Sequence, residues 1–447
     1  MTQLLTKETR YAADFAALEE KAKGDPQWLQ DLRRKAYDRF SSIGFPTARR
    51  GNEEWKYTSV GPIAEQRYHV ALNGATPEIS LAKIKRAIPW DEAWPRLVFI
   101  NGRYVPEFSK PHTHGGELVV RNLAEAVRDD GAVMEHLARH ADFESNAFTA
   151  LNTAFLQDGA YVKVAEDATA RDPVHIVYMA TGECDQSLSR PRTLLVAGSH
   201  AKATVIETYV NLGKGRYFTN AVTEASIGDG AQIDRYLLLM EGAEAFHVGS
   251  AHVQAGRDSS FTSTAVSLGA AIARSNTSVV LNAPGASATV NGLYVTSGAQ
   301  HLDMHTSLFH AAPQTTSRQQ HKGILDGQSR SVFAGRVVIP AGSQKADARL
   351  VNKNLLLSRG AEVDTKPSME IFADDVKATH GATAGQLDQT TLFYLNSRGI
   401  DADSARRLLV HGFASEILNG VQIAKLRAFL DRLFLKSLPL DGSKGAA

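Results

Sequence analysis

The sequence contains almost no cysteine. Cys184 is the single thiol among 447 residues. One thiol cannot close an intrachain disulfide, and it cannot hold a thiolate-bound metal cluster alone, because such clusters take about four ligands. The residues around Cys184 supply neither a base nor a cation that would make the thiol a nucleophile. The cysteine content therefore excludes a disulfide scaffold and favours a reducing compartment, and it assigns Cys184 no role.

A charge of one sign and long apolar runs are also lacking. The 49 Lys and Arg residues nearly balance the 48 Asp and Glu residues, which leaves a formal net charge of +1. No basic stripe interleaved with aromatics is present, so we expect no nucleic-acid partner. No run reaches the roughly 18 apolar residues of a membrane span, and the N-terminus lacks the basic and apolar regions of a secretion signal. We therefore expect a globular cytoplasmic protein without a membrane partner.

Helical patterns occur in the first third of the chain. Residues 10–40 and 127–159 have the composition of helices, and Asp25 is the expected N-cap of a helix in the first segment. Between the two segments, Asn101-Gly102 separates two short apolar runs. This dipeptide favours a tight type I′ turn, so it predicts a hairpin.

Two amphipathic helices are expected after residue 385. In the first, Leu409, Phe413 and Ile417 recur at steps of four, behind Asp401 or Asp403 as N-cap. The composition thus changes twice along the chain. The expected units are an N-terminal helical and mixed domain (1–160), a β-rich core (161–377) and a C-terminal helical subdomain (378–447).

The expected core is a parallel β-helix. Helical periodicity disappears there, and turn-forming residues recur at 228, 242, 256, 269, 285, 298, 313, 327, 342 and 360. Two successive intervals make a period of about 29 residues, as expected when each coil contains two strands. In "ASATVN", Ala286, Ala288 and Val290 alternate with polar residues and would face the interior. The predicted fold class is mainly β, a parallel β-helix between helical ends, and a β-sandwich is the alternative.

One polar cluster on an expected strand is a candidate metal site. His301, Asp303 and His305 stand at steps of two, so a strand would place all three on one face. Imidazoles and a carboxylate can together bind a divalent metal. The alternative is a polar sheet surface that faces solvent or another subunit.

His380 is a second candidate. It follows an acidic pair, Asp374 and Asp375, and is flanked by small residues at an expected strand-to-helix junction. Small flanking residues allow another chain or an ion to come close. An imidazole titrates near pH ~6.5 and can bind a metal or carry a proton. The alternative is a histidine that only caps the junction.

Three long motifs resemble the SufB/SufD family of iron–sulfur cluster assembly proteins. They are "HLDMHTSLFHAAPQTTS", "RQQHKGILDGQSRSVFAGRVVIPAGSQKADARLVNKNLLLS" and "ADDVKATHGATAGQLDQTTLFYLNSRGI", and the similarity covers roughly residues 190–420. The N-terminal "GFPTARRGNEEWKYTSV" and the form "HGAT" are similar to the shorter, SufD branch of the family.

The resemblance implies a fold and a role. Members have a right-handed parallel β-helix between helical ends, and they act as scaffold subunits rather than enzymes. The implied partners are a SufB-like subunit at the β-helix and a SufC-like ABC ATPase at the C-terminal helices. No cofactor is expected to bind tightly, and iron or a nascent cluster would be held transiently at the interface between subunits.

The resemblance also implies site residues. The functional histidine of the family falls on His380, which would be a ligand of iron or of the cluster. A cysteine often stands two residues earlier in the family, and here that position is Ala378. For partner binding by the C-terminal helices we expect Phe393, Tyr394, Arg398 and Phe413.

Two other functions are compatible with a β-helix. A solenoid has open ends that need caps or partners, so a self-paired structural protein, or a homodimer of the isolated chain, is one alternative. A carbohydrate-active enzyme is the other. It would need clusters of acidic or basic residues along one exposed sheet, whereas the outward strand positions here carry mostly Ser, Thr, Asn and Gln.

Overall fold

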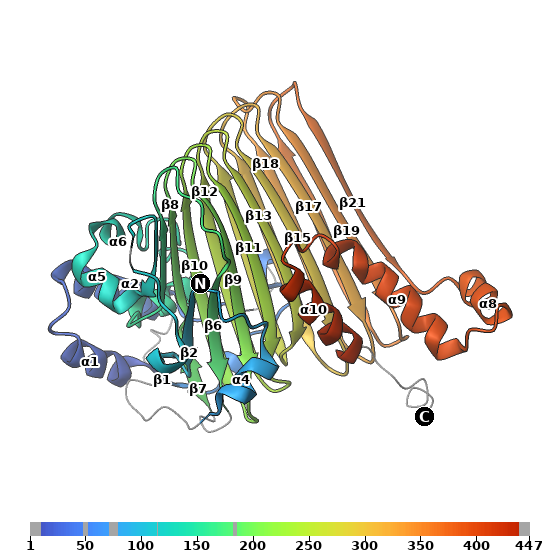
Figure 1. Ribbon diagram of the computed structural model, residues 1–447, viewed down its shortest axis with the longest axis horizontal. Coiled ribbons are helices and arrows are strands. Elements are labelled where there is room, and N and C mark those ends of the chain that lie inside the picture. The colour runs from blue at the N-terminus through green and yellow to red at the C-terminus, as the bar shows by residue number, and fades with distance from the viewer. Residues whose placement is uncertain (1–9, 48–51, 71–78, 114, 182–185, 438–447) are drawn as a thin grey trace, which may run out of the picture.

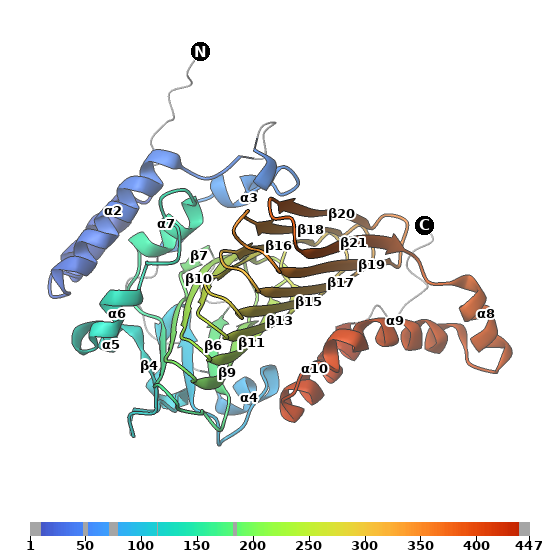
Figure 2. The same ribbon diagram turned by 90° about the horizontal axis from the view of Figure 1, so that it is seen from above.

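The protein is a β-solenoid with helices at both ends of the chain. The computed structural model describes residues 10–47, 52–70, 79–113, 115–181 and 186–437. Two parallel sheets form the body, the N-terminal helices cover its first coils, and the C-terminal helices lie on the outside of one sheet (Figures 1 and 2). None of the helices in these ranges is long and apolar enough to cross a membrane.

The N-terminal part is a mixture of short elements. Its helices are α1 (Ala12–Lys21), α2 (Gln27–Ile43), η1 (Glu53–Trp55), α3 (Gly61–Ala64), α4 (Leu81–Ala87), η2 (Pro106–Phe108), α5 (Leu123–Asp129), α6 (Gly131–His136) and α7 (Ala147–Ala154). Its strands are β1 (His69–Val70), β2 (Arg96–Ile100), β3 (Arg103–Tyr104) and β4 (Leu118–Asn122).

The predicted hairpin is present, and one predicted cap is wrong. β2 and β3 pair antiparallel around Asn101 and Gly102, whose φ angles of 51° and 79° are those of a type I′ turn. The N-cap of α2 is Pro26 rather than Asp25. The Asp25 carboxylate instead forms an ion pair with the buried guanidinium of Arg33, at 2.8 Å.

Consecutive strands of the solenoid alternate between two sheets. Sheet A contains β8 (Arg192–Ala197), β10 (Tyr217–Ile227), β12 (Phe246–Ala255), β14 (Ile272–Leu281), β16 (His301–His310), β18 (Arg330–Ile339) and β20 (Glu362–Ile371). Sheet B contains β9 (Lys202–Asn211), β11 (Gln232–Glu241), β13 (Ser260–Gly269), β15 (Ser287–Thr296), β17 (Thr316–Leu325), β19 (Asp347–Leu356) and β21 (Lys377–Gly385). At the first coils, β5 (Ala160–Val164) and β7 (Ser187–Ser189) join sheet A, and β6 (Val174–Ala180) joins sheet B.

The strand register confirms the predicted period. Ser287 pairs with Thr316, which is 29 positions further along the chain. The offset ranges from 26 positions, between Phe246 and Ile272, to 33 positions, between Ala160 and Thr193. Each coil therefore stacks on the next in parallel register, and the predicted fold class is confirmed.

The solenoid interior is the main hydrophobic core. Ala286, Ala288 and Val290 are buried there, as their alternation with polar residues predicts. Strands on both sides of the expected unit boundaries take part in the two sheets. β2 and β4 extend them before residue 160, and β21 extends sheet B beyond residue 377.

The C-terminal helices are α8 (Gln389–Ser397), α9 (Ala402–Leu418) and α10 (Ala424–Ser437). Asp401 caps α9, since its side chain accepts from the backbone N–H of Ser404. α9 and α10 pack on the outer face of sheet B through these residues: Val410, Ala414, Ile417, Leu418, Leu426, Leu430 and Phe434. Of the predicted stripe, Ile417 is buried, whereas Leu409 and Phe413 are half-buried.

Candidate functional site

The solenoid ends without a cap. β20 and β21 are the last strands of sheets A and B, and within the described residues each is paired along one edge only, with β18 and β19. Neither strand contains a fully buried residue. Beside them, Ile371 and Phe372 have exposed fractions of 41% and 65%. Unpaired strand edges next to exposed apolar side chains form a surface that another chain can cover. We call this surface, residues 362–385, the open end.

His380 lies on the open end. It is in the middle of β21, directly beside Leu350 of β19. Leu350 is buried in the solenoid interior, so His380 lies on the inward face of the last coil. Its side chain is nevertheless exposed, because no further coil covers it. The expected strand-to-helix junction is wrong, since β21 continues past His380 and α8 begins only at Gln389.

The neighbours of His380 do not complete a metal site. Ala378 lies on the same face of β21 and packs against the interior core. Asp374 and Asp375 are exposed in the turn before the strand. In the described part of the chain, no three His, Cys, Asp or Glu side chains are grouped so that they could hold a metal ion. This chain can therefore offer one imidazole at the open end, and further ligands would have to come from another molecule.

A second exposed surface lies on α8. This helix projects away from the solenoid (Figure 2), and it buries only Leu392. Phe393 and Tyr394 have exposed fractions of 74% and 55%, and the Arg398 guanidinium lies 5.2 Å from the centre of the Tyr394 ring. Of the four residues predicted to bind a partner, Phe393 and Tyr394 thus lie on this helix, and Arg398 is its C-cap. We call α8 and the first half of α9, residues 389–410, the C-terminal lobe.

The fourth predicted partner residue, Phe413, lies apart from the other three. It is half-buried between α9 and sheet B. The ammonium group of Lys322, on β17, lies 4.3 Å from the centre of the Phe413 ring and donates a hydrogen bond of 2.8 Å to the Phe413 carbonyl. The same ammonium forms an ion pair of 2.7 Å with Glu416. Sequence reasoning missed Lys322, because it lies among polar residues of its strand and nothing in the local sequence marks it.

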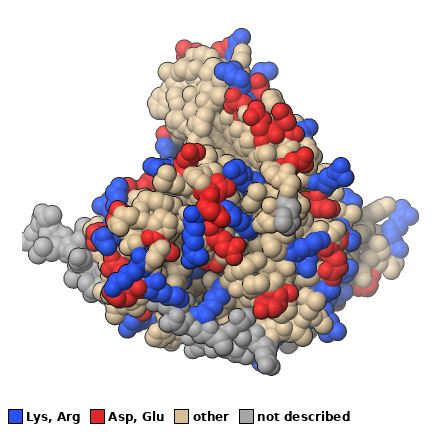
Figure 3. Space-filling view, turned by 60° about the vertical axis from the view of Figure 1, so that its left-hand side comes forward, with Lys and Arg blue, Asp and Glu red and all other residues tan. Residues whose placement is uncertain are grey.

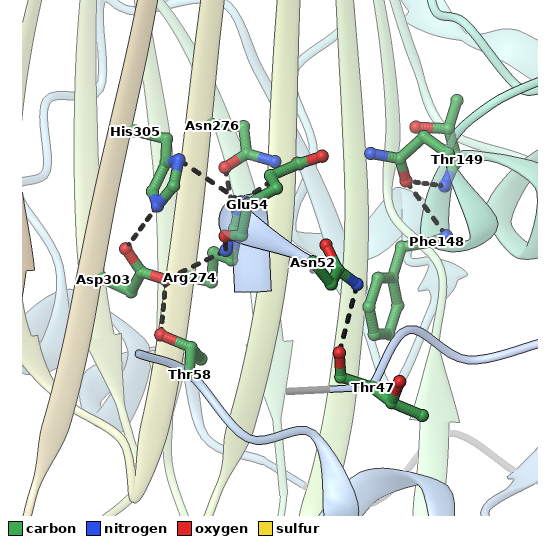
Figure 4. Close-up of polar contacts among 11 residues, drawn as sticks. Thr47, Asn52, Glu54, Thr58, Phe148, Thr149, Arg274, Asn276, Asp303 and His305 are labelled. Atoms are coloured by element: carbon green, nitrogen blue, oxygen red, sulfur yellow. Dashed lines mark hydrogen bonds and ion pairs between the residues drawn. The ribbon is translucent and has the colours of Figure 1, made fainter. Parts of the chain in front are cut away.

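The His301, Asp303 and His305 cluster contacts the N-terminal segment. His301 Nε2 lies 2.9 Å from Thr58 Oγ1, and Figure 4 shows Asp303 and His305 beside Arg274, Glu54 and Thr58. As predicted, the three residues share one face of β16, and this face is turned toward residues 52–60. The Asp303 carboxylate accepts from Thr58 Oγ1 at 2.5 Å and from Arg274 Nη1 at 3.0 Å, and it contacts His305 Nε2 at 2.8 Å.

The charges of this cluster are satisfied within the chain. Burial alone would raise the pKa of the Asp303 carboxyl. The opposing effect of His305 and Arg274 is larger, so the pKa falls from 3.8 to about 2. Arg274 also donates a hydrogen bond of 2.7 Å to the Glu54 carbonyl. Its guanidinium lies against the Trp55 ring, 3.8 Å from the ring centre. The carboxylate is thus occupied by the guanidinium, so the metal-site interpretation of these residues is wrong. The cluster anchors the N-terminal segment to sheet A.

Two further histidines have ordinary structural partners. His247 Nδ1 lies 2.9 Å from the Glu241 carboxylate inside the solenoid, and His252 Nε2 lies 3.2 Å from Ser250. Cys184 lies outside the described residues. Acidic and basic side chains are mixed over the face shown in Figure 3, without a broad field of one sign.

The comparisons with known proteins agree with this architecture. A family model for the SufBD core domain of the SUF system for FeS cluster assembly matches residues 177–413, and a model for the SufBD protein N-terminal region matches residues 6–176. The chain belongs to the SufBD family. It is therefore an iron–sulfur cluster assembly protein of that family, as the motifs between residues 301 and 400 predicted.

Several relatives of this SufBD protein match along nearly the whole chain. The iron-sulfur cluster assembly SufBD family protein slr0076 of Synechocystis is 30% identical over 437 residues, which cover 95% of each chain. The iron-sulfur cluster assembly protein SufD of Escherichia coli is 30% identical over 405 residues, which cover 90% of each chain. The protein SufD of Bacillus subtilis is 24% identical over 410 residues, which cover 89% of this chain and 91% of that protein.

Proposed function

We propose that this SufBD protein is a scaffold subunit of a SufBCD-type complex. In this complex a SufB-like subunit covers the open end, and a SufC-like ABC ATPase binds the C-terminal lobe. The nascent iron–sulfur cluster is the cargo of the complex and is assembled where the open end meets the SufB-like subunit. The chain contributes surfaces and one ligand, and the ATPase supplies the nucleotide chemistry.

The observation that carries this proposal is the uncapped end of the solenoid. Both terminal strands leave one edge unpaired, and Ile371 and Phe372 are exposed beside them. An exposed strand edge can pair with another chain, and natural proteins usually cover or blunt it. A partner of the same fold has a last coil of matching width. The open end therefore favours a second SufBD chain over an unrelated partner.

His380 gives the open end a ligand for iron. Imidazole nitrogen is a good ligand for iron, and the exposed side chain lies on the surface that the partner would cover. Since Ala378 offers no ligand, the sulfur ligands would be thiolates of the SufB-like subunit or sulfide itself. A single ligand from this chain suits transient binding better than a resident cofactor.

The C-terminal lobe has the features of a docking surface for the ATPase. Phe393 and Tyr394 are aromatic and exposed, and Arg398 stands beside them. Aromatic and Arg side chains are enriched where proteins bind one another. The lobe also lies beyond the solenoid (Figure 1), so the ATPase could bind it while the open end is covered.

Two substitutions test the two interfaces separately. The full chain is co-expressed with its SufB-like and SufC-like partners, and the complexes are purified through a tag on this chain and weighed by native mass spectrometry. Phe372→Glu should lose the SufB-like subunit and keep the ATPase, whereas Phe393→Glu should do the reverse. The proposal is wrong if neither substitution changes the composition. If wild type carries a second copy of itself when the SufB-like subunit is present, the open end serves self-pairing instead.

The role of His380 is tested in the intact complex. His380→Ala should leave the composition unchanged and reduce the iron and acid-labile sulfide recovered per complex after ATP-dependent assembly. His112→Ala is the matched control, because His112 is also exposed but lies far from the open end in the sequence and on no solenoid strand. An unchanged cluster yield in His380→Ala would exclude the ligand role.

A further inference from the structure

Helix α9 is anchored over only half of its length. From Val410 onward it packs on sheet B, through Val410, Ala414, Ile417 and Leu418, which are all buried. Before Val410, Ala405 is the one buried residue of the helix, Arg406 and Arg407 are exposed, and Leu408 has an exposed fraction of 53%. One continuous helix thus joins the exposed C-terminal lobe to a well-packed base.

The exposed part and the packed part of α9 meet at a helical turn that contains a glycine. Gly412 lies inside α9, where glycine is less favourable than alanine because it loses more conformational freedom on folding. A Cβ added at Gly412 would meet no atom within 4 Å, so packing does not require the glycine. Three residues later, the Ser415 hydroxyl donates a hydrogen bond of 2.7 Å to the His411 carbonyl. Such hydrogen bonds from a side chain to the preceding turn often bend helices.

Lys322 holds this same turn from the solenoid. Its side chain is only 1% exposed, and its ammonium group reaches both the Phe413 carbonyl, at 2.8 Å, and the Glu416 carboxylate, at 2.7 Å. Gln320, two residues earlier on β17, donates a further 3.2 Å bond to Glu416. A buried ammonium needs its partners because it has lost its water. The contacts therefore fix the turn to β17 at the point where the helix leaves the sheet.

We propose that residues 411–416 of α9 form a hinge for the C-terminal lobe, and that Lys322 is the positioning residue that clamps it. The lobe turns about Gly412 and draws Val410 away from sheet B, while the part of α9 after Gly412 and all of α10 stay on the sheet. This inference deepens the proposed function, because an ATPase bound to the lobe would then move it against the solenoid without unfolding the packed base. A stiffer hinge would transmit less of that movement.

The hinge is tested first in the isolated full-length chain by amide hydrogen exchange. Gly412→Ala should slow exchange in residues 402–410 by about two- to fivefold, the range expected when a helix gains alanine in place of glycine. Exchange in residues 424–437 should not change. Gly342→Ala is the matched control, since an added Cβ there also meets nothing within 4 Å. Equal slowing in both segments, or none in the lobe, would overturn the hinge.

The clamp is tested by loosening it. Lys322→Met keeps an unbranched chain and removes the charge, so exchange in residues 402–410 should become severalfold faster than in residues 424–437. Should that variant fold poorly, Glu416→Gln provides a second measurement, because Glu416 is half-exposed and the bond from Lys322 to the Phe413 carbonyl remains. It should act in the same direction and more weakly. Faster exchange spread evenly over α9 and α10 would exclude a local clamp.

Measurements on the complex distinguish a failure of the hinge proposal from a failure of the proposed function. Gly412→Ala should bind the ATPase as wild type does and form less cluster per ATP hydrolysed. If wild type does not bind the ATPase through the lobe, the proposed function fails, while the exchange results on the isolated chain still decide the hinge. If the ATPase binds and Gly412→Ala assembles clusters at the wild-type rate, the hinge has no part in assembly.

Discussion

The Asp303 carboxylate should contribute strongly to the attachment of the N-terminal segment. It is 1% exposed and joins Thr58, on the segment, to Arg274 and His305 on sheet A. Burial would raise the pKa of this carboxyl, but its partners lower the pKa from 3.8 to about 2. This lowering corresponds to a stabilisation on the order of 2 kcal/mol. Because the folded-state pKa is depressed, this stabilisation is present above pH ~4 and is lost as the pH falls toward 2.

Asp303→Asn is the substitution that tests this reasoning. It retains the shape of the side chain, but among the described residues it leaves the buried guanidinium of Arg274 with the exposed Glu54 as its one charged partner. Removing one member of a buried ion pair costs about 3–5 kcal/mol. The amide oxygen can still accept hydrogen bonds, so we expect a loss of about 2–3 kcal/mol in the free energy of unfolding.

The assay is urea unfolding at pH 7 together with hydrogen exchange of residues 52–60. Trp55 lies against Arg274 and makes tryptophan fluorescence a local reporter. Asp364→Asn is the control, because Asp364 pairs with the partly exposed Arg330, and such surface pairs contribute about 0–1 kcal/mol. A loss below 1 kcal/mol in Asp303→Asn, with unchanged exchange in residues 52–60, would refute the anchoring role.

Three further outcomes are expected. Gly323→Ala should destabilise the solenoid by about 1–3 kcal/mol in urea unfolding, because the new Cβ would lie 2.3 Å from a ring carbon of Tyr294. His310 is buried, and burial lowers its pKa to about 4. The unfolded chain binds a proton at this histidine more readily than the folded protein does. The free energy of unfolding is therefore independent of this group above pH ~6.5 and should fall by about 3 kcal/mol as the pH drops to 4. His310→Asn should flatten that part of the pH profile of unfolding. Replacing Phe393 and Tyr394 together by serine should weaken binding of the ATPase at least tenfold in titration calorimetry, as expected for exposed aromatic anchors.

Each of these outcomes has a control and a contrary result. Gly342→Ala should leave stability unchanged, since nothing lies within 4 Å of an added Cβ there, and equal effects at the two glycines would contradict the packing argument. An unchanged pH profile in His310→Asn would show that another group titrates. Leu81→Ser removes an exposed apolar side chain from a different surface, so it should not affect binding of the ATPase.

Much of the solenoid could be read from local patterns. The recurrence of turns about every 14 residues and the alternation around Ala288 reflect how each coil must close and bury small residues, and the register agrees with both. The hairpin at Asn101 follows equally from local backbone preference. The placement of His380 at a junction was wrong because small residues such as Gly381 and Ala382 have a low β-propensity on their own. Pairing with β19 extends the strand through them.

The sequence by itself determined the family, the stacked coils and the residue types available for chemistry, because these depend on motifs and on short-range periodicity. Only the tertiary structure decided which side chains from distant segments meet. Thr58 donates to the carboxylate that looked like a metal ligand, 245 residues away in the chain, and Lys322 holds a helix 91 residues away. The last coil leaves His380 uncovered. Contacts of this kind arise from packing between distant segments, and the spacing of residues along the chain does not encode them.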